Sequence, residues 1–554
     1  MNRIVLFLMT CLFALYCDCT NQPLAGGSSQ QGNGKIVGAV VNLDGSPAKK
    51  VSIRICPDDY LQKPLPGSDR DNVFEVFTDS LGRFTVDGLQ SGIYSIEANN
   101  KVTVAAMTTT AINELDSSSD IGTLCLKPYA KISGSVKSFA TGSNTASIIQ
   151  IKGLERYTRL NDDGSFAFND LPEGRFEVRV VSGDSAVPPR IVSGITTQSE
   201  RTDTLSIPSQ WRYGHRFHLN TTATGADISE SVNHFPVLLR LTGENFDFSQ
   251  TNSDGSDVRF IRKGTTFLSY EIESWDNESK QAEVWIKVDS IYGNDSIQSI
   301  TMFWDNNAAE PLINTCHVFD TSLGYAGVWH LNEKTGCSAT DVSGNNYTGT
   351  YKGGLPRNDN SGIGVCQRIE QPDSDYVDMG NILNIGNSNI TIGLWIKQGS
   401  FKTPQALIAK TNGDLPSASY GYLLSIDPGN FPHFNIASGG TAWGDDSTFD
   451  IACSLVIPDT TSWHYLSIVI DRATNTNCKM YLDGIDRTGK ITGNITTVPS
   501  VSNAASLRIG TENDNNGSFN GSIAEATISL TTRSSPWVKL LYMNQKSRDA
   551  LVKW

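Results

Sequence analysis

The feature that most constrains the fold is an internal repeat. The segments 78–98 and 161–180 carry glycine, aromatic and leucine residues in the same order, at a constant offset of 82 positions. The matched residues are Gly82, Phe84, Leu89, Gly92 and Tyr94 in the first copy and Gly164, Phe166, Leu171, Gly174 and Phe176 in the second. A similar strand pattern precedes each copy, at 35–41 and 131–136. Self-similarity of this kind predicts two tandem modules of one fold.

The residues of the repeat have mechanical roles in a β-sandwich. Gly82 and Gly164 are expected in tight turns with positive φ, each followed by a strand whose aromatic residue points inward. The pattern resembles the carboxypeptidase regulatory-like domain, which is a transthyretin-like β-sandwich. The resemblance implies such domains at 35–128 and, in shorter form, at 129–207. It implies no catalytic residues, and leaves two roles open: a rigid stalk or a carbohydrate-contacting spacer.

A third β domain is predicted at 208–310. Alternating runs at 235–242, 270–276 and 282–288 indicate strands with one buried face. The ordered set resembles a bacterial domain of unknown function numbered 2341, for which no activity is established.

One strand of this third domain has the look of a catalytic motif. Glu271 and Glu273 share a face, with Asp276 nearby, as in the carboxylate strand of laminarinase-type glycosidases. The spacing of these acids differs from that of the glycosidase strand, and they lie in the third domain rather than in the jelly-roll segment. We therefore interpret these acids as a solvated strand edge.

The segment 315–554 is predicted to be the largest module. Many short strands separated by Gly, Asn and Asp turns indicate a two-sheet jelly roll. The segment resembles the laminin-G-like, concanavalin A-like lectin/glucanase superfamily over nearly its whole length. One of the more specific marks is the run 481–484, a hairpin with an Asp-Gly turn after the Trp463 strand. The tail 536–542 is expected to form a short amphipathic helix on the sandwich. The predicted fold class of the whole chain is therefore all-β.

The resemblance to lectin-like domains implies a glycan-binding surface with exposed aromatic rings. The predicted ligand-binding residues are Trp443, in the loop-like run 438–447, together with Tyr420 and Tyr422. For Trp443, a buried loop anchor is an equal alternative. Trp329, Trp395 and Trp463 lie in strand patterns and are expected in the core.

The same resemblance raises the question of a structural Ca²⁺. The family's Asp-x-Ser-Gly-Asn loop is present at 341–345, so Asp341 is the predicted metal ligand, with Glu525 as a second. The family's acidic residue just before Glu525 is Ala524 here. A bound Ca²⁺ and no cofactor at all both stay open.

The N-terminus predicts export. An apolar run from 4 to 16 has the length of a signal-peptide core, and it ends at Cys17, as in bacterial lipoprotein signals. The expected arrangement is a signal peptide at 1–17, lipidation of Cys17 and a flexible tether at 18–34. This places the protein on a bacterial membrane, at the outer membrane or cell surface. An ordinary cleaved signal is the alternative.

Charge and cysteine content fit an exported protein. Forty-four basic and 58 acidic residues give a net charge of −14, so nucleic acid is not an expected partner. Cys56 and Cys125 flank the first sandwich and could form a disulfide.

Taken together, these features predict a non-catalytic cell-surface lipoprotein that presents a lectin-like jelly roll on β-sandwich spacers. The expected partner is a polysaccharide or cell-surface glycan. A structural or adhesive protein that binds other proteins is the alternative. A concanavalin-type glycosidase is disfavoured, because the jelly-roll segment lacks a paired-carboxylate strand.

Overall fold

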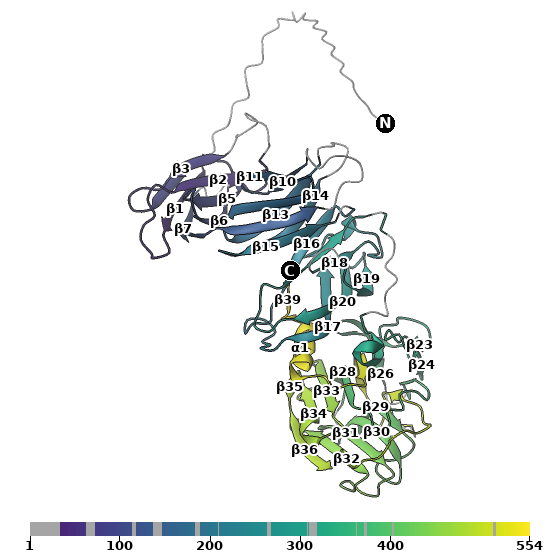
Figure 1. Cartoon of the computed structure of the whole chain (residues 1–554). Coiled ribbons are helices and arrows are strands. Elements are labelled where there is room, and N and C mark those ends of the chain that lie inside the picture. The colour runs from purple at the N-terminus through teal and green to yellow at the C-terminus, as the bar shows by residue number, and fades with distance from the viewer. Residues whose placement is uncertain are drawn as a thin grey trace, which may run out of the picture. The chain divides into compact units, whose positions relative to one another are not determined.

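The computed structural model describes residues 34–62, 73–113, 118–136, 147–182, 189–208, 210–262, 267–306, 308–309, 318–361, 363–370, 374–400, 404–513 and 517–554. The predicted signal peptide, the tether and Cys17 lie outside these residues. The chain divides into two compact units. The first ends at Leu126, and the second runs from Lys127 to Trp554 and also includes residues 59–62 and 103–105. The architecture is almost entirely β, as the sequence predicts (Figure 1).

The first unit is a sandwich of two sheets, with strand orders β4-β1-β7 and β3-β2-β5-β6. Its strands are β1 (Gly34–Val41), β2 (Ser52–Pro57), β3 (Phe74–Phe77), β4 (Arg83–Leu89), β5 (Gly92–Asn99), β6 (Val104–Ile112) and β7 (Ser118–Cys125). Phe84, Leu89 and Tyr94 are buried between the sheets, as predicted. Gly82 has φ +74°, and a Cβ there would lie 2.4 Å from the carbonyl oxygen of Val40, so only glycine fits.

The second unit begins with a sandwich of the same plan. Its sheets have the orders β12-β9-β15 and β11-β10-β13-β14. The strand β1 of the first sandwich and the strand β9 of the second each pair antiparallel with one neighbour and parallel with the other. The sequence repeat is therefore a repeat of strand order. The strands are β8 (Lys127–Pro128), β9 (Ala130–Val136), β10 (Ile148–Ile151), β11 (Arg156–Arg159), β12 (Ser165–Leu171), β13 (Gly174–Val181), β14 (Arg190–Thr197) and β15 (Thr202–Ile207).

The domain that follows continues one of these sheets. β14 pairs in parallel with β16, and β16 pairs with β21, so that one eight-stranded sheet runs from the sandwich into the third domain. A separate three-stranded sheet has the order β17-β20-β19. The strands are β16 (Tyr213–Leu219), β17 (Val232–Thr242), β18 (Arg259–Ile261), β19 (Tyr270–Asp276), β20 (Gln281–Ile291) and β21 (Ser299–Trp304), with a 3-10 turn at Phe248–Gln250.

The C-terminal domain is a jelly roll of two sheets. One has the order β25-β26-β38-β28-β33-β34-β35, with β22 also paired to β38, and the other has the order β23-β24-β27-β37-β29-β30-β31-β32-β36. The elements are β22 (Tyr325–Trp329), β23 (Ser338–Ala339), β24 (Gly349–Lys352), β25 (Asn358–Ser361), β26 (Gly364–Ile369), β27 (Tyr376–Asp378), β28 (Ile390–Gln398), β29 (Gln405–Thr411), β30 (Tyr420–Ile426), β31 (Pro432–Ser438), β32 (Thr448–Cys453), β33 (His464–Ile470), β34 (Lys479–Leu482), β35 (Ile485–Asp486), β36 (Thr488–Gly493), β37 (Arg508–Ile509) and β38 (Gly521–Ser529), with 3-10 turns at Thr321–Leu323 and Asn475–Asn477.

The chain returns to the third domain after the jelly roll. The predicted helix is α1 (Ser535–Gln545), which begins at an Ser534 N-cap and lies against β17 (Figure 1). The last strand, β39 (Val552–Lys553), pairs with β16. The two domains predicted at 208–310 and 315–554 are thus joined through the C-terminal tail.

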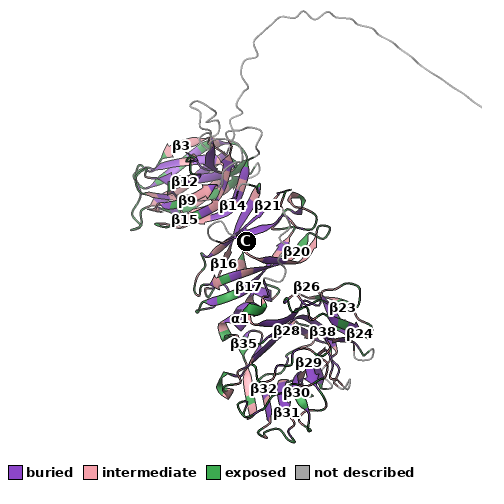
Figure 2. Ribbon diagram, turned by 45° about the vertical axis from the view of Figure 1, so that its right-hand side comes forward, coloured by how far each residue is buried: buried purple, intermediate pink, exposed green. Residues whose placement is uncertain are grey.

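Packing of the jelly roll explains the long apolar runs in its strands. Its two sheets enclose one core, and the outer face of the β28–β38 sheet packs on the third domain through a second core. β28 and β38 are therefore buried along nearly their whole length, as Figure 2 shows.

Two further expectations can be compared with the structure. Cys125 is an exposed free thiol, so no disulfide links it to Cys56 among the described residues. In the part of the chain that the structure describes, no helix has the length and apolarity needed to cross a bilayer.

Candidate functional site

Trp443 lies on a braced surface loop between β31 and β32. Its side chain is 37% exposed, so it is a surface residue rather than a buried anchor. The Asp445 carboxylate accepts hydrogen bonds from the amides of Thr441 and Ala442, both at 2.9 Å. The Thr448 hydroxyl accepts from the Gly444 amide at 3.0 Å. These bonds hold the loop in one shape, with the indole on the outside.

The two predicted tyrosines have different positions. Tyr420, at the start of β30, is 40% exposed and pairs with Ser438 at the end of β31, which puts it at the same end of the sheet as Trp443. Tyr422 is 1% exposed, and its hydroxyl donates to the Leu383 carbonyl at 3.1 Å. The prediction for Tyr422 is wrong, because position 422 packs in the core between the two sheets, whereas Tyr420 on the same face lies at the exposed end of the strand.

Trp463 is a partly exposed aromatic residue that the sequence did not predict as a ligand-binding one. The strand pattern predicted it in the core with Trp329 and Trp395, and those two are buried. Trp463 instead lies just before β33, is partly exposed and lines a cleft of about 520 Å³ beside α1. The Lys397 ammonium is 5.3 Å from its ring centroid.

Asp341 does not have the geometry of a metal ligand. Its Oδ1 accepts from the amides of Val328 and Ser343, and its Oδ2 accepts from the hydroxyl of Ser343 and the amide of Tyr347. A carboxylate has about four lone-pair positions, and these four donors occupy them. Glu525, the other predicted ligand, contacts His330 instead. The structure therefore does not support Ca²⁺ bound by Asp341 and Glu525.

Four titratable side chains meet where the third domain packs on the jelly roll, and we call them the interface cluster: Glu271 and Glu273 of β19, His330 just after β22, and Glu525 of β38. Their side chains are between 2% and 5% exposed. His330 Nδ1 lies 2.8 Å from Glu525 Oε2 and 3.7 Å from Glu273 Oε2. His330 Nε2 lies 3.5 Å from Glu271 Oε1.

The cluster corrects one sequence interpretation. Glu271 and Glu273 do share a face, but that face is buried against the jelly roll and is not a solvated strand edge. Asp276 lies apart from them, because it accepts hydrogen bonds from the amides of Glu278 and Ser279 in the turn after β19. The three acids therefore do not lie together on one exposed face.

Burial and mutual charge dominate the electrostatics of the cluster. Burial, with the nearby Glu525 charge, raises the pKa of Glu273. For His330, burial opposes the charged form, but Glu525 and Glu273 outweigh it and raise the pKa well above its usual value. The sequence did contain one signal of this cluster, because Glu273, His330 and Glu525 are titratable residues within otherwise apolar strand segments. Nothing in the sequence indicated that the three segments meet.

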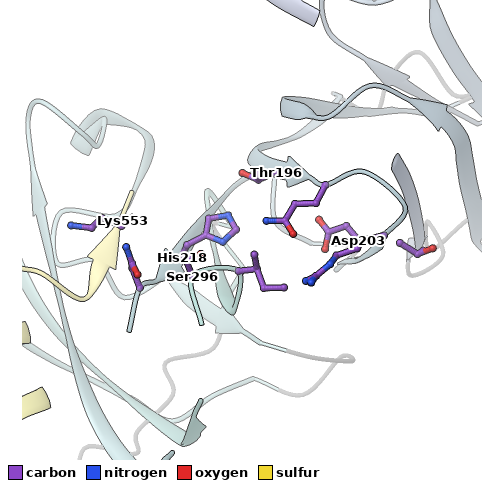
Figure 3. Close-up of a pocket in the computed structure, with 10 residues that line it drawn as sticks. Thr196, Asp203, His218, Ser296 and Lys553 are labelled. Atoms are coloured by element: carbon purple, nitrogen blue, oxygen red, sulfur yellow. The ribbon is translucent and has the colours of Figure 1, made fainter. Parts of the chain in front are cut away.

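A second cleft, of about 280 Å³, lies between β14, β15, β16 and β39. Figure 3 shows the His218 ring in its middle, with Lys553 on one side and Asp203 on the other. Burial lowers the pKa of His218, which favours a neutral imidazole. Asp203 is paired with Arg216. The lining includes none of the residues predicted as sites.

Comparison with known families identifies two of the domains. Residues 371–539 match Laminin_G_3, described as the concanavalin A-like lectin/glucanases superfamily. Residues 254–324 match DUF2341, a domain of unknown function. Both are families that the sequence resembled, and each match covers less than half of the chain. No curated protein has a sequence that matches this one.

Several solved structures are similar to parts of the chain. The binding domain of Paraclostridial Mosquitocidal Protein 1 is 15% identical, with TM-score 0.30, over 40% of this chain and 52% of its own, so this chain spans about half of it. The CBM40 of Ruminococcus gnavus IT-sialidase bound to alpha2,3 sialyllactose is 15% identical, with TM-score 0.22, over 28% of this chain and 83% of its own. A third similar structure is Domain 4 of AbnA, a GH43 extracellular arabinanase from Geobacillus stearothermophilus, in complex with arabinotriose. It is 17% identical, with TM-score 0.26, over 39% of this chain and 96% of its own.

Proposed function

We propose that this protein is a non-catalytic cell-surface lipoprotein that binds glycan through its concanavalin A-like domain. The observation that carries the proposal is the exposed indole of Trp443 on a braced loop of a lectin-like domain. A flat apolar ring can stack on the CH face of a sugar ring, and aromatic anchors typically dominate binding energy. A loop that is already ordered loses less conformational entropy when a ligand binds.

The surroundings of Trp443 favour a neutral glycan. Asp445 and Asp446 lie in the same loop, and Asp414 lies in the neighbouring loop before β30. The rest of this end of the sheet includes partly exposed hydroxyl groups such as that of Ser438, which donates to the Ser500 carbonyl oxygen and can still accept a hydrogen bond. Such groups can exchange hydrogen bonds with sugar hydroxyls, whereas the carboxylates would repel an anionic polymer.

The positions of the acids support a non-catalytic role. Glycosidases place two carboxylates on either side of an accessible glycosidic bond. Glu271 and Glu273 are buried at a domain interface, and Asp276 serves a turn. We therefore expect the purified chain to release no reducing sugar from polysaccharides. Release that disappears in Glu271→Gln or Glu273→Gln would show that the protein is a hydrolase.

The binding proposal is tested with the full chain on a glycan array, followed by titration calorimetry with the best neutral oligosaccharide. Trp443→Ala is expected to cost about 1–3 kcal/mol of binding free energy, as truncation of an aromatic anchor does. Phe431→Ala is the matched control, because Phe431 is an aromatic residue of similar exposure, 36%, at the opposite end of β30 and β31. It is expected to leave affinity unchanged.

Two results would contradict this assignment. Equal loss in Trp443→Ala and Phe431→Ala would mean that the loop has no special role, and loss confined to Trp463→Ala would place the ligand in the cleft beside α1. If no glycan binds while a protein partner does, the chain is an adhesive protein instead.

The lipid anchor is a separate prediction about Cys17. Cells that express the chain are grown with a radioactive fatty acid, and the label is expected on the wild type and on Cys19→Ser but not on Cys17→Ser. Normal export without label in the wild type would show that the signal is an ordinary cleaved one.

A further inference from the structure

The interface cluster joins three segments that are far apart in the sequence. Glu271 and Glu273 come from β19 in the third domain, while His330 follows β22 and Glu525 lies in β38, both in the jelly roll. All four side chains are at least nine-tenths buried. Glu525 has φ +53° in a β-bulge, and its amide donates to the His330 carbonyl oxygen at 3.4 Å. A strained backbone of this kind persists where the surroundings require it.

The donor atoms are arranged as in a metal centre. One oxygen or nitrogen from each of Glu273, His330 and Glu525 lies within 4.8 Å of the others. Glu525 presents both oxygens to His330 Nδ1, at 2.8 and 3.1 Å. The distances from His330 Nδ1, 2.8 Å to Glu525 Oε2 and 3.7 Å to Glu273 Oε2, are within the span of two ligand bonds of about 2.0–2.2 Å each.

The outer contacts complete this arrangement. A metal-bound histidine almost always donates its other ring N–H to a carboxylate or carbonyl, and ligating carboxylates are themselves hydrogen-bonded. Here His330 Nε2 faces Glu271 Oε1 at 3.5 Å. The Trp285 indole donates to Glu273 Oε2 at 2.7 Å, and the Asn332 amide donates to its Oε1 at 3.4 Å.

A second observation points to a missing cation. Among the described residues, Glu271 Oε2 and His330 Nε2 are buried polar atoms without a hydrogen-bond partner. Three carboxylates meet one imidazole here, and although the Arg240 charge acts on Glu273 and Glu525, it acts on Glu283 and Asp549 as well. Buried charge that is not compensated is strongly destabilising. A divalent cation bound at His330 Nδ1 would take the place of the imidazole proton there and add one further positive charge among the three carboxylates.

The aromatic neighbours and the ligand types of the site favour a transition-metal ion over Ca²⁺. The Trp285 ring stacks on His330 at 5.8 Å between centroids, and the Phe319 ring lies 5.7 Å from it. These aromatic walls limit the number of water ligands. Ca²⁺ requires six to eight oxygens, about twice what the cluster offers, whereas an imidazole with carboxylates suits Zn²⁺ or Mn²⁺.

We propose that Glu273, His330 and Glu525 bind one Zn²⁺ or Mn²⁺ ion that clamps the third domain to the jelly roll. When the ion is bound, Glu271 would accept the Nε2–H of His330, which has no hydrogen-bond partner in this structure, and would so orient the imidazole with Nδ1 toward the ion. Because the ligands come from both domains, the ion stabilises the joint between them. This clamp does not depend on glycan binding.

The test uses the full chain, stripped with EDTA and titrated separately with Zn²⁺, Mn²⁺ and Ca²⁺. We expect one bound Zn²⁺ or Mn²⁺ per chain by plasma mass spectrometry after gel filtration, and a Tm that rises with the concentration of the ion. Glu273→Gln and Glu525→Gln are expected to abolish both effects. Glu271→Gln should weaken affinity about 10- to 100-fold, as loss of an outer partner does. Glu278→Gln, an exposed acid after β19, is the matched control and should bind as the wild type does.

Each alternative outcome has a definite meaning. No retained Zn²⁺ or Mn²⁺ in the wild type would overturn the proposal and leave the cluster as a proton-sharing network. Binding that survives both Glu273→Gln and Glu525→Gln would place the ion elsewhere, and a preference for Ca²⁺ would refute the cation class. If those two variants fail to fold, Co²⁺ absorption in the wild type and Glu271→Gln decides, because a change in the visible bands reports directly on the His330 ligand.

Discussion

Glu525 owes its position to a one-residue irregularity in β38. Ala524 packs in the core shared with the third domain, whereas Ile523 and Ala526 pack in the inner core of the jelly roll. In a regular strand, residues 523 and 525 would face the same side. The bulge breaks the alternation, so that Ala524 and Glu525 both face the third domain. One extra residue therefore turns a charge out of the apolar core of the sandwich.

Asp445 gives a prediction about pH. Hydrogen bonds from the backbone of Thr441 and Ala442 hold the pKa of Asp445 below its usual value of 3.8. A lowered pKa means that the ionised form stabilises the loop above that value, and that this contribution is lost as the pH falls through the lowered pKa. We expect glycan affinity to be level from neutral pH down to about pH 4, and to fall below it.

Asp445→Asn should reproduce the acidic behaviour at neutral pH. The expected loss is about 2- to 10-fold in affinity, the entropic cost of ordering a loosened loop. The measurement is calorimetric titration of the same oligosaccharide at several pH values. Asp446→Asn changes the charge of the loop equally and serves as the control. Equal losses in the two variants would indicate an effect of charge rather than of loop geometry.

At the scale of elements, α1 packs against both the third domain and the jelly roll. The sequence predicted an amphipathic helix, but Trp537, Val538, Leu540 and Leu541 are all buried, because the helix lies between β17 and the jelly roll. Asn544 binds the backbone of β17 from the end of the helix. Its Oδ1 accepts from the Leu238 amide at 2.7 Å, and its Nδ2 donates to the Leu238 carbonyl at 2.9 Å.

Asn544→Ala therefore leaves two buried backbone groups of Leu238 without partners. We expect a loss of about 2–5 kcal/mol in the free energy of unfolding, since each buried unsatisfied group costs about 1–3 kcal/mol. Urea unfolding followed by tryptophan fluorescence measures this change. Asn360→Ala, at an exposed position of β25, is the control and should change stability by less than about 0.5 kcal/mol. A similarly small change in Asn544→Ala would mean that the helix end is already solvated.

At the scale of the whole chain, the third domain and the jelly roll share one hydrophobic core. Phe235 of β17 packs edge-to-face on Trp537 of α1 at 5.8 Å, and Trp554 stacks on His215 of β16 at 4.1 Å. A fragment covering 318–554 would expose these surfaces, at a cost of roughly 1.5–3 kcal/mol for each large apolar side chain.

We therefore predict that fragment 318–554 melts at least about 10 °C below the same domain in fragment 127–554, since each kcal/mol corresponds to about 2–4 °C in a domain of this size. Scanning calorimetry compares the two, and binding of a hydrophobic dye should increase only in the shorter fragment. Equal melting temperatures would show that the shared core adds no stability.

Much of the architecture could be predicted because it depends on local chemistry. Glycine at Gly82 and Gly164, followed by alternating strands, encodes the turns and inward faces of both sandwiches. The Asp-Gly turn after Tyr481 marks a hairpin, and the apolar residues of the tail mark α1. The position of Trp443 in a polar, glycine-rich loop follows from the same reasoning, whereas its exposure was left open by the sequence. Each of these patterns is complete within about ten residues of sequence.

The rest depended on residues far apart in the chain. Tyr422 and Trp463 were misplaced because burial depends on which strand lies opposite. Glu271 and Glu273 read as a solvated edge because the jelly-roll face that covers them comes from the other end of the chain. The sequence by itself determined the fold class and the two recognisable domains. Only the tertiary structure brought His330 and Glu525 to β19, since a packing interface between domains leaves no periodic signal in either of the segments that form it.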